Sequence, residues 1–178
     1  MSVVAFMRVA LALMLGVAAA AAQQPLETRG AWSLVPDGDN FAVRTQALGA
    51  PESTLSLYCR KPEAYALAIK SPALADRPSG EDIRISFKVD DNDPAWFNLT
   101  TGPDGTVPIA HQTAFWIIYP ALTRNEAKAV AFTAADHGWQ FSLDGLKDIV
   151  PALSARCGFE PMRPEPQERR TRPGGPTR

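Results

Sequence analysis

The segment Ile83-Arg-Ile-Ser-Phe-Lys-Val89 is the clearest indication of how this chain folds. Every second residue of it is apolar, and the residues between them are arginine, serine and lysine. A period of two is typical of a β-strand that rests one face on a core and turns the other face to water. Strands that are wet on one side belong to antiparallel sheets. We therefore expect a mainly β protein built on an antiparallel sheet.

The same alternation recurs on both sides of this strand. It covers residues 41–46, 54–59 and 65–69 upstream, and residues 128–132 and 139–143 downstream. Clusters of glycine, proline, aspartate and asparagine separate the apolar segments, as is usual for turns. Residues 135–138 predict a hairpin loop, so the two downstream strands should pair antiparallel. Short strands separated in this way predict an antiparallel β-sandwich-like domain.

Several segments after the central strand are less regular. We expect residues 95–99 to form a hairpin with residues 106–110 through the turn between them. Residues 113–119 are almost wholly apolar, and periodicity alone does not assign such a run to a strand or to a helix. Residues 123–126 match a capping box, whereas residues 128–132 alternate as in a strand. A helical turn that leads into a strand would satisfy both signals.

A short C-terminal α-helix is expected to close the domain. Leu146, Ile149, Val150 and Leu153 recur at helical spacing, so they form one apolar stripe that can pack on the sheet. Pro151 lies within this segment, and a proline inside a helix costs about 3 kcal/mol. We therefore expect the helix to begin late, to kink or to break into two pieces.

The first 22 residues have the composition of a secretory signal peptide. One positive charge, Arg8, precedes an apolar stretch that ends in alanines up to Ala22. The alternative is a transmembrane helix, which would need about 20 apolar residues and flanking charges, whereas this stretch runs into glutamines. We expect cleavage after Ala22, export to the periplasm or out of the cell, and no stable membrane anchor.

The remaining chain has the length of one domain. We expect an extended lead-in over residues 23–30, a single β-rich domain over residues 31–159 and a disordered tail over residues 160–178. The tail is rich in proline and arginine and has almost no large apolar residue, so it cannot bury enough surface to fold. Without Arg8 the chain has 17 basic and 19 acidic side chains, a net charge of about −2. This balance offers no electrostatic basis for binding nucleic acid.

Two cysteines, Cys59 and Cys157, lie near the two ends of the expected domain. An even number of cysteines in an exported chain favours a disulfide, because the compartment is oxidising. Two free buried thiols or a metal site are the alternatives. With only two thiols and distant histidines, metal is the weaker hypothesis. We expect a disulfide between Cys59 and Cys157, no metal and no cofactor.

The most concentrated group of charges is Asp90, Asp91 and Asp93, with Trp96 soon after it. Clustered carboxylates suit a hard cation such as calcium. However, the loop glycine and the distal glutamate of an EF-hand are missing here. A solvated turn is the better hypothesis, and we expect these four residues to face a binding partner.

The sequence offers few groups for catalysis. Trp32, Trp116 and Trp139 lie on apolar segments, and we expect them in the core. His111 and His137 are the two imidazoles, and each lies in or beside an expected turn, away from any plausible nucleophile. Motifs of serine hydrolases, metalloproteases and nucleotide-binding proteins are absent from the sequence. We therefore expect no catalytic residue.

Several short motifs, taken together, are similar to a known family. They are Trp32, the run Leu-Ser-Leu-Tyr-Cys at residues 55–59, the strand that ends in Asp90, the run at residues 138–146 and Cys157-Gly158. This layout resembles small bacterial periplasmic domains of the type VI secretion-associated VasI kind and, more distantly, the invasion-associated locus B proteins. The resemblance implies a β-sandwich-like domain closed by a C-terminal helix and a cysteine pair, without catalytic residues. Pro151 and the tail depart from the pattern.

Three functional hypotheses follow from these features. The first is a non-enzymatic periplasmic domain that binds an envelope protein or a cell-wall partner. The second is an inhibitor or accessory subunit of a cell-wall hydrolase, which would present residues 90–94 to a positively charged cleft. The third is an enzyme that uses His111 or His137, because catalytic groups can come from distant turns.

Overall fold

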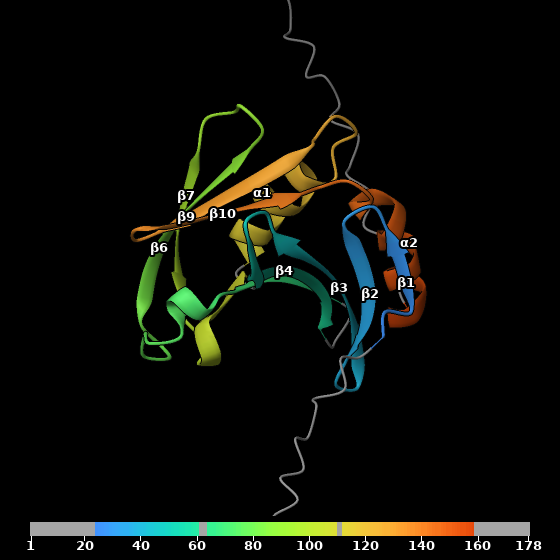
Figure 1. Ribbon diagram of the computed structural model, residues 1–178, viewed down its shortest axis with the longest axis horizontal. Coiled ribbons are helices and arrows are strands. Elements are labelled where there is room, and N and C mark those ends of the chain that lie inside the picture. Colours follow the sequence, from blue (N-terminus) through green and yellow to red (C-terminus); the bar gives the residue numbers. More distant parts are fainter. Residues whose placement is uncertain (1–23, 61–63, 110–111, 159–178) are drawn as a thin grey trace, which may run out of the picture.

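A computed structural model describes residues 24–60, 64–109 and 112–158 (Figure 1). The expected signal peptide, the expected tail over residues 160–178 and His111 lie outside the described residues. The strands are β1 (Glu27–Arg29), β2 (Trp32–Asp37), β3 (Asn40–Ala47), β4 (Ala50–Arg60), β5 (Ala64–Lys70), β6 (Asp82–Val89), β7 (Ala95–Thr100), β8 (Thr106–Ile109), β9 (Ala129–Ala134) and β10 (His137–Ser142). The helices are α1 (Gln112–Leu122), α2 (Leu146–Cys157) and the short 3-10 turns η1 (Pro72–Leu74) and η2 (Pro103–Gly105).

All the described strands belong to one antiparallel sheet that curves around a single core. Its order is β7-β6-β9-β10-β3-β4-β5-β8, and β2 pairs with β3 and with β1. The two halves of the sheet join where β10 meets β3, with Phe141 opposite Ala47. Buried side chains from both halves form one hydrophobic cluster. The prediction of a mainly β, antiparallel fold with a C-terminal helix is therefore confirmed.

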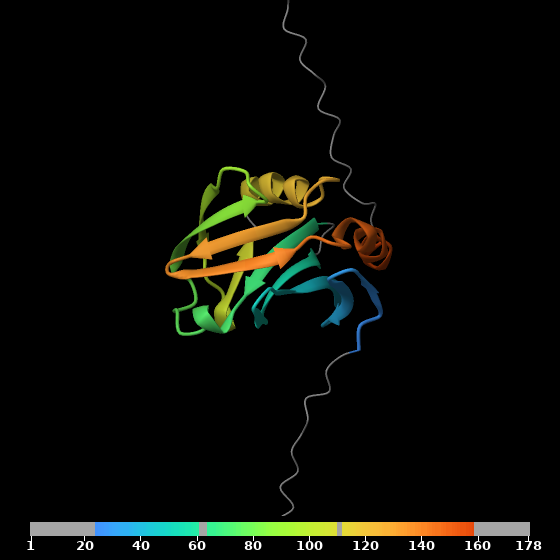
Figure 2. The same cartoon turned by 45° about the horizontal axis from the view of Figure 1, so that its top comes forward.

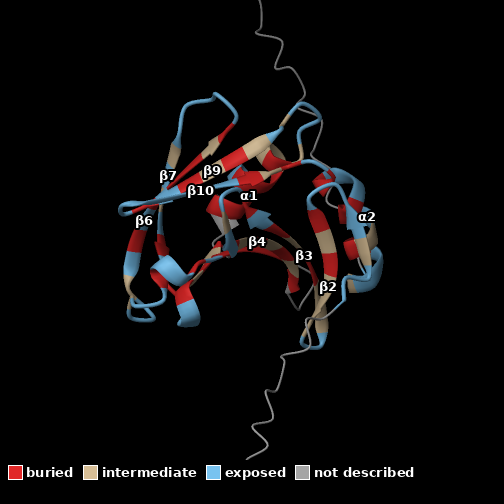
Figure 3. Cartoon of the chain, viewed as in Figure 1, coloured by how far each residue is buried: buried red, intermediate tan, exposed pale blue. Residues whose placement is uncertain are grey.

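The alternating segment at residues 83–89 lies in β6, and its apolar face is buried as expected. Ile83, Ile85, Phe87 and Val89 are all at most 5% exposed. On the opposite face Arg84 is exposed, Lys88 is half-buried and Ser86 is buried, so this face is only partly open to water. Figure 3 shows buried residues along the strands and exposed residues at the turn between β6 and β7. The expected pairing of β9 with β10 is also confirmed, with Trp139 opposite Phe132.

The expected hairpin of residues 95–99 with residues 106–110 is wrong. Instead β7 pairs with β6, and β8 pairs with β5 in the other half of the sheet. The chain crosses between the halves at η2, where the N–H of Gly102 donates to the carbonyl of Thr106. Gly105 has a φ of 68°, and a Cβ there would collide with the carbonyl oxygen of Ser71. The backbones of Gly105 and Ser71 therefore lie close together at the point where the chain passes to the half of the sheet that contains β5 and β8.

The apolar run at residues 113–119 lies in the helix α1. Its buried side chains are Ala114, Phe115, Ile118, Tyr119 and Leu122. This face leaves Trp116 59% exposed, because successive side chains of a helix point in different directions. The expectation that Trp116 belongs to the core is therefore wrong. Trp32 and Trp139 are buried, as expected.

Residues 123–126, which match a capping box, do not begin a helix. Thr123 follows the last turn of α1, and its hydroxyl donates to the carbonyl of Tyr119 at 3.0 Å. Residues 124–127 form a turn, closed by the N–H of Ala127 and the carbonyl of Arg124 at 3.2 Å. The strand expected after the turn is present as β9.

The helix α2 runs without a break through Pro151. Leu146, Ile149, Val150 and Leu153 are buried, and α2 packs against β1, β2 and β3 (Figure 2). Burial of four large aliphatic side chains contributes about 6 to 12 kcal/mol, which outweighs the cost of about 3 kcal/mol for one interior proline. Pro151 itself lies on the exposed face. The predicted late start or break of this helix is therefore wrong, because α2 is continuous from Leu146 to Cys157.

Candidate functional site

The surface expected to face a partner begins with Asp90, which follows β6 with a φ of 50°. Its N–H donates to the carbonyl of Ala129 at 3.1 Å. Its carboxylate accepts hydrogen bonds from the N–H groups of Lys128 at 3.1 Å and Ala129 at 2.9 Å. Asp90 therefore ties the end of β6 to the start of β9, so much of its hydrogen-bonding capacity is used within the chain.

The rest of the turn presents its carboxylates to solvent. The backbone N–H of Asn92 donates to the carbonyl of Val89 at 3.1 Å, and its side-chain amide donates to the same oxygen at 2.9 Å. These two bonds hold the turn in shape. Asp91 and Asp93 are exposed on either side of Asn92. The turn thus carries two outward carboxylates on a hydrogen-bonded loop.

A groove of about 450 Å³ runs beside this turn. Its walls are the turn itself and the loop between α1 and β9, and its lining residues are Asp90, Asp91, Asn92, Arg124, Asn125, Glu126 and Ala127. Three carboxylates and one guanidinium line the groove, so its charge is negative. The second wall is not evident from the sequence, because residues 123–126 match the capping box of a helix start.

Trp96 lies on the same hairpin as the acidic turn, and it is 52% exposed. It is opposite Ser86 of β6. The guanidinium carbon of Arg84 lies 4.7 Å from the centre of the indole ring, which is a cation–π contact. The structure therefore places Trp96 beside the turn, as expected, and adds Arg84 as its neighbour. Arg84 lies two residues before Ser86 on β6, so it is a diagonal neighbour of Trp96 across the two strands. The pairing of β6 with β7 would have been needed to predict this contact.

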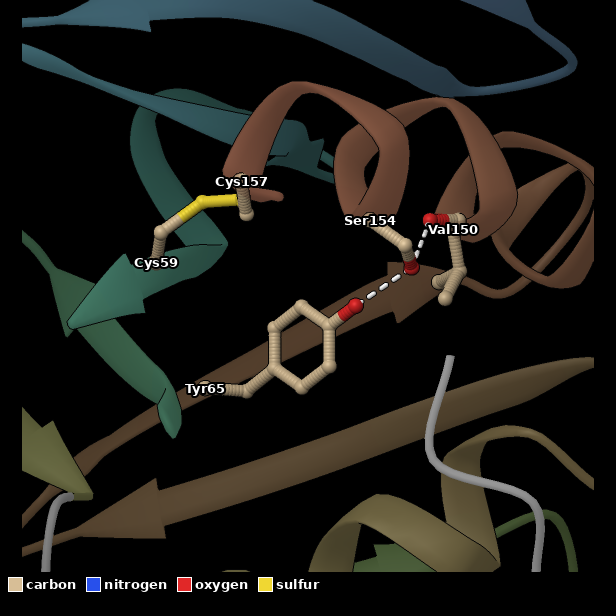
Figure 4. Close-up of a disulfide and its surroundings, with 5 residues drawn as sticks. All are labelled: Cys59, Tyr65, Val150, Ser154 and Cys157. Atoms are coloured by element: carbon tan, nitrogen blue, oxygen red, sulfur yellow. Dashed lines mark hydrogen bonds between the residues drawn. A yellow bond between two sulfur atoms is a disulfide. The ribbon is translucent and has the colours of Figure 1, made fainter. Parts of the chain in front are cut away.

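The two cysteines form a disulfide, as expected. Cys59 lies near the end of β4 and Cys157 ends α2, with 98 residues of sequence separation and 6.1 Å between their Cα atoms (Figure 4). Close by, the hydroxyl of Ser154 donates to the carbonyl of Val150 at 2.9 Å and is hydrogen-bonded to the hydroxyl of Tyr65. A covalent link and a buried polar contact thus hold α2 on the sheet.

Two tyrosines in this part of the core have weakened acidity. Burial raises the pKa of Tyr65 above its usual value. Burial, together with the nearby Tyr65, raises the pKa of Tyr119 to about 12. The two rings stack with their centres 6.0 Å apart, and Phe115 stacks on Tyr119 at 5.3 Å. These hydroxyls therefore stay protonated near neutral pH, and the rings serve as packing.

His137 is the expected candidate for chemistry that the structure describes. His137 is exposed at the start of β10, and its ring centre lies 6.2 Å from that of Trp139. Among residues 24–60, 64–109 and 112–158, no three histidine, cysteine, aspartate or glutamate side chains are arranged to hold a metal ion. Within these same ranges, neither helix has the length and apolar character needed to cross a bilayer.

Comparison of the chain with protein-family models, with curated proteins and with solved structures found no match. The resemblance to the VasI and locus B proteins therefore stays a prediction.

Proposed function

We propose that this chain is an exported, non-enzymatic domain that binds an envelope protein or a cell-wall partner through the acidic hairpin. The acidic hairpin is the surface formed by the turn at residues 90–93, Trp96 and the negative groove beside them. The observation that carries the proposal is Trp96, half exposed beside a turn with two free carboxylates. Tryptophan is enriched at the energetic centres of protein interfaces, and flanking charges select the partner.

The disulfide and the hydrogen bonds of Asp90 support the same proposal. A bridge that holds α2 on the sheet is consistent with a domain that works in an oxidising compartment. The hairpin stands on this rigid scaffold, because the carboxylate of Asp90 fastens it to β9. A rigid surface loses little conformational entropy when it binds, which favours recognition.

The test is site-specific photocrosslinking in the cells that make the protein. A photoreactive amino acid replaces Trp96 in one variant and Leu48 in a control variant. Leu48 is a matched control because it is 59% exposed and lies in the turn between β3 and β4, outside the acidic hairpin. We expect a discrete adduct from position 96 and none from position 48. Equal labelling at both positions, or none at 96, would refute the proposal.

The second candidate function is inhibition or support of a cell-wall hydrolase. The exposed Asp91 and Asp93 favour it, because a negative turn suits the positively charged cleft of such an enzyme. Purified protein should then change muramidase or amidase activity, and Asp91→Asn with Asp93→Asn should remove the effect. Activity that stays constant on addition of the wild-type protein would eliminate this candidate.

A further inference from the structure

The strand β7 has an open edge that faces away from its partner β6. The N–H of Asp90 donates to the carbonyl of Ala129, so the even-numbered residues of β6 form their backbone hydrogen bonds with β9. The odd-numbered residues of β6 therefore bond to β7, where they are opposite odd-numbered residues such as Phe97. The N–H of Thr101 donates to the carbonyl of Glu81 at 2.9 Å, so beyond the end of β7 the hydrogen bond again joins two odd-numbered residues. The N–H and C=O groups of Trp96 and Asn98 consequently point to the free edge.

These outward groups are available for a further strand. In the part of the chain that the structure describes, β7 pairs with β6 alone, and no backbone hydrogen bond joins Trp96 or Asn98 to another segment. Trp96 and Asn98 are exposed, and the β6–β7 hairpin forms the border of the sheet in Figure 1. Two residues of this kind offer two donors and two acceptors in one row, which is a template for strand addition.

The other two edges of the described sheet are protected, whereas this one is not. β8 has four residues and contains Pro108, which cannot donate a hydrogen bond. β1 has three residues, with an ion pair between Glu27 and Arg29 at 2.9 Å. β7 has six residues and contains no charge, proline or glycine. Natural sheets usually protect a long edge with such residues, so an unprotected edge indicates a binding function.

The charges around β7 decide which occupant fits the edge. A second copy of this chain, paired antiparallel about a two-fold axis, would bring the acidic turn of each copy toward the far end of the other hairpin. Asp82 and Asp104 are exposed at that far end, so like charges would meet. A foreign strand that carries lysine or arginine at one end would instead place positive charge beside Asp91 and Asp93.

We infer that β7 binds an extended segment of a partner protein by strand addition, with a basic residue of that segment beside the acidic turn. The inference rests on the proposed function and names its partner class. Main-chain hydrogen bonds to Trp96 and Asn98 supply the pairing. The acidic turn determines the register, and a β-branched side chain of the segment packs against the indole of Trp96.

Synthetic peptides test this inference with the oxidised wild-type protein. The probe alternates threonine and valine, with two lysines at either its first or its last positions, so that both strand directions are sampled. Two-dimensional NMR should show shifted and exchange-protected backbone amides at Trp96 and Asn98. A peptide with glutamates in place of the lysines should bind about tenfold less tightly. A peptide with N-methyl groups on alternate residues should not bind, because it lacks the required donors.

Two variants separate strand addition from simple charge attraction. Asn98→Pro removes an outward N–H that β6 does not use, so the sheet should persist while the dissociation constant rises about tenfold or more. Asn98→Thr keeps the N–H and should bind as the wild type does. If Asn98→Pro fails to fold, the N-methylated peptide on the wild-type protein gives the same answer.

The possible results distinguish this inference from the proposed function. Equal binding of the N-methylated peptide, or of Asn98→Pro, would overturn strand addition, and so would no amide protection by either lysine peptide. A wild-type dimer that Asn98→Pro abolishes in sedimentation would make a second copy the occupant and also overturn the inference. Peptide binding without a cellular adduct at position 96 would refute the proposed function alone. An adduct that persists in Asn98→Pro would refute strand addition alone.

Discussion

Removal of the disulfide gives the most direct measure of what stabilises this fold. Cys59→Ala combined with Cys157→Ala opens a loop defined by a sequence separation of 98 residues. In the chain-entropy model, closure of such a loop lowers the entropy of the unfolded chain by an amount equal to about 4.7 kcal/mol at 25 °C. A domain of this size has a free energy of unfolding of about 5 to 15 kcal/mol. The double variant should therefore still fold, but with a much smaller free energy of unfolding.

The double variant should keep its native structure in buffer. The apolar stripe of α2 stays buried without the bridge, and the hydroxyls of Tyr65 and Ser154 still meet. Far-ultraviolet circular dichroism should thus match that of the wild type, while the urea midpoint falls and the free energy of unfolding drops by about 3 to 5 kcal/mol. Thermal unfolding should begin about 10 °C lower or more.

Wild-type protein in reducing agent is the internal control for this measurement, because it lacks the bridge but keeps both cysteines. Its unfolding curve should coincide with that of the double variant. A loss of stability below about 1 kcal/mol in both samples would contradict the loop-entropy argument. A loss confined to the double variant would indicate that the alanines disturb packing and that the bridge contributes little.

Three further measurements test separate parts of the structure. Asp90→Ala removes the carboxylate that accepts hydrogen bonds from two backbone N–H groups, so urea denaturation should show that the free energy of unfolding falls by about 1 to 3 kcal/mol. Asp90→Asn should lower it less, because the amide oxygen can still accept. Equal losses in the two variants would contradict a stabilising role of these hydrogen bonds. Burial raises the pKa of Tyr119 to about 12 from a usual value of 10.0, so the contribution of Tyr119 to stability should be constant below pH 10 and fall as the pH rises toward 12. Ultraviolet titration checks this, and ionisation of all tyrosines near pH 10 in the folded protein would refute it. Gly145→Ala would place a Cβ against the carbonyl of Arg29 and should destabilise far more than Gly38→Ala, which also has a positive φ but open space around it; equal melting temperatures would refute the contact.

Part of the candidate site was predictable, because it lies in one continuous stretch. Asp91, Asp93 and Trp96 are close in sequence, so a turn followed by a strand was enough to place them together. The second wall of the groove was not predictable. Arg124 and Glu126 come from a loop that packing of α1 brings beside the turn, and no local pattern encodes that approach.

Sequence alone was enough to predict strands β3 to β10, the buried face of α2 and the pairing of the two cysteines, whereas β1 lies in the segment expected to be an extended lead-in. These features depend on a period of two, a period of 3.6 or the presence of one thiol partner, all of which are local or compositional. Three features depend on how distant segments pack: β7 pairs with β6, the apolar run of α1 is helical, and Trp116 is exposed. A strand can pair with any edge of matching polarity, and an apolar run can be buried as a strand or as a helix. The packing of distant segments into one core selects among these alternatives.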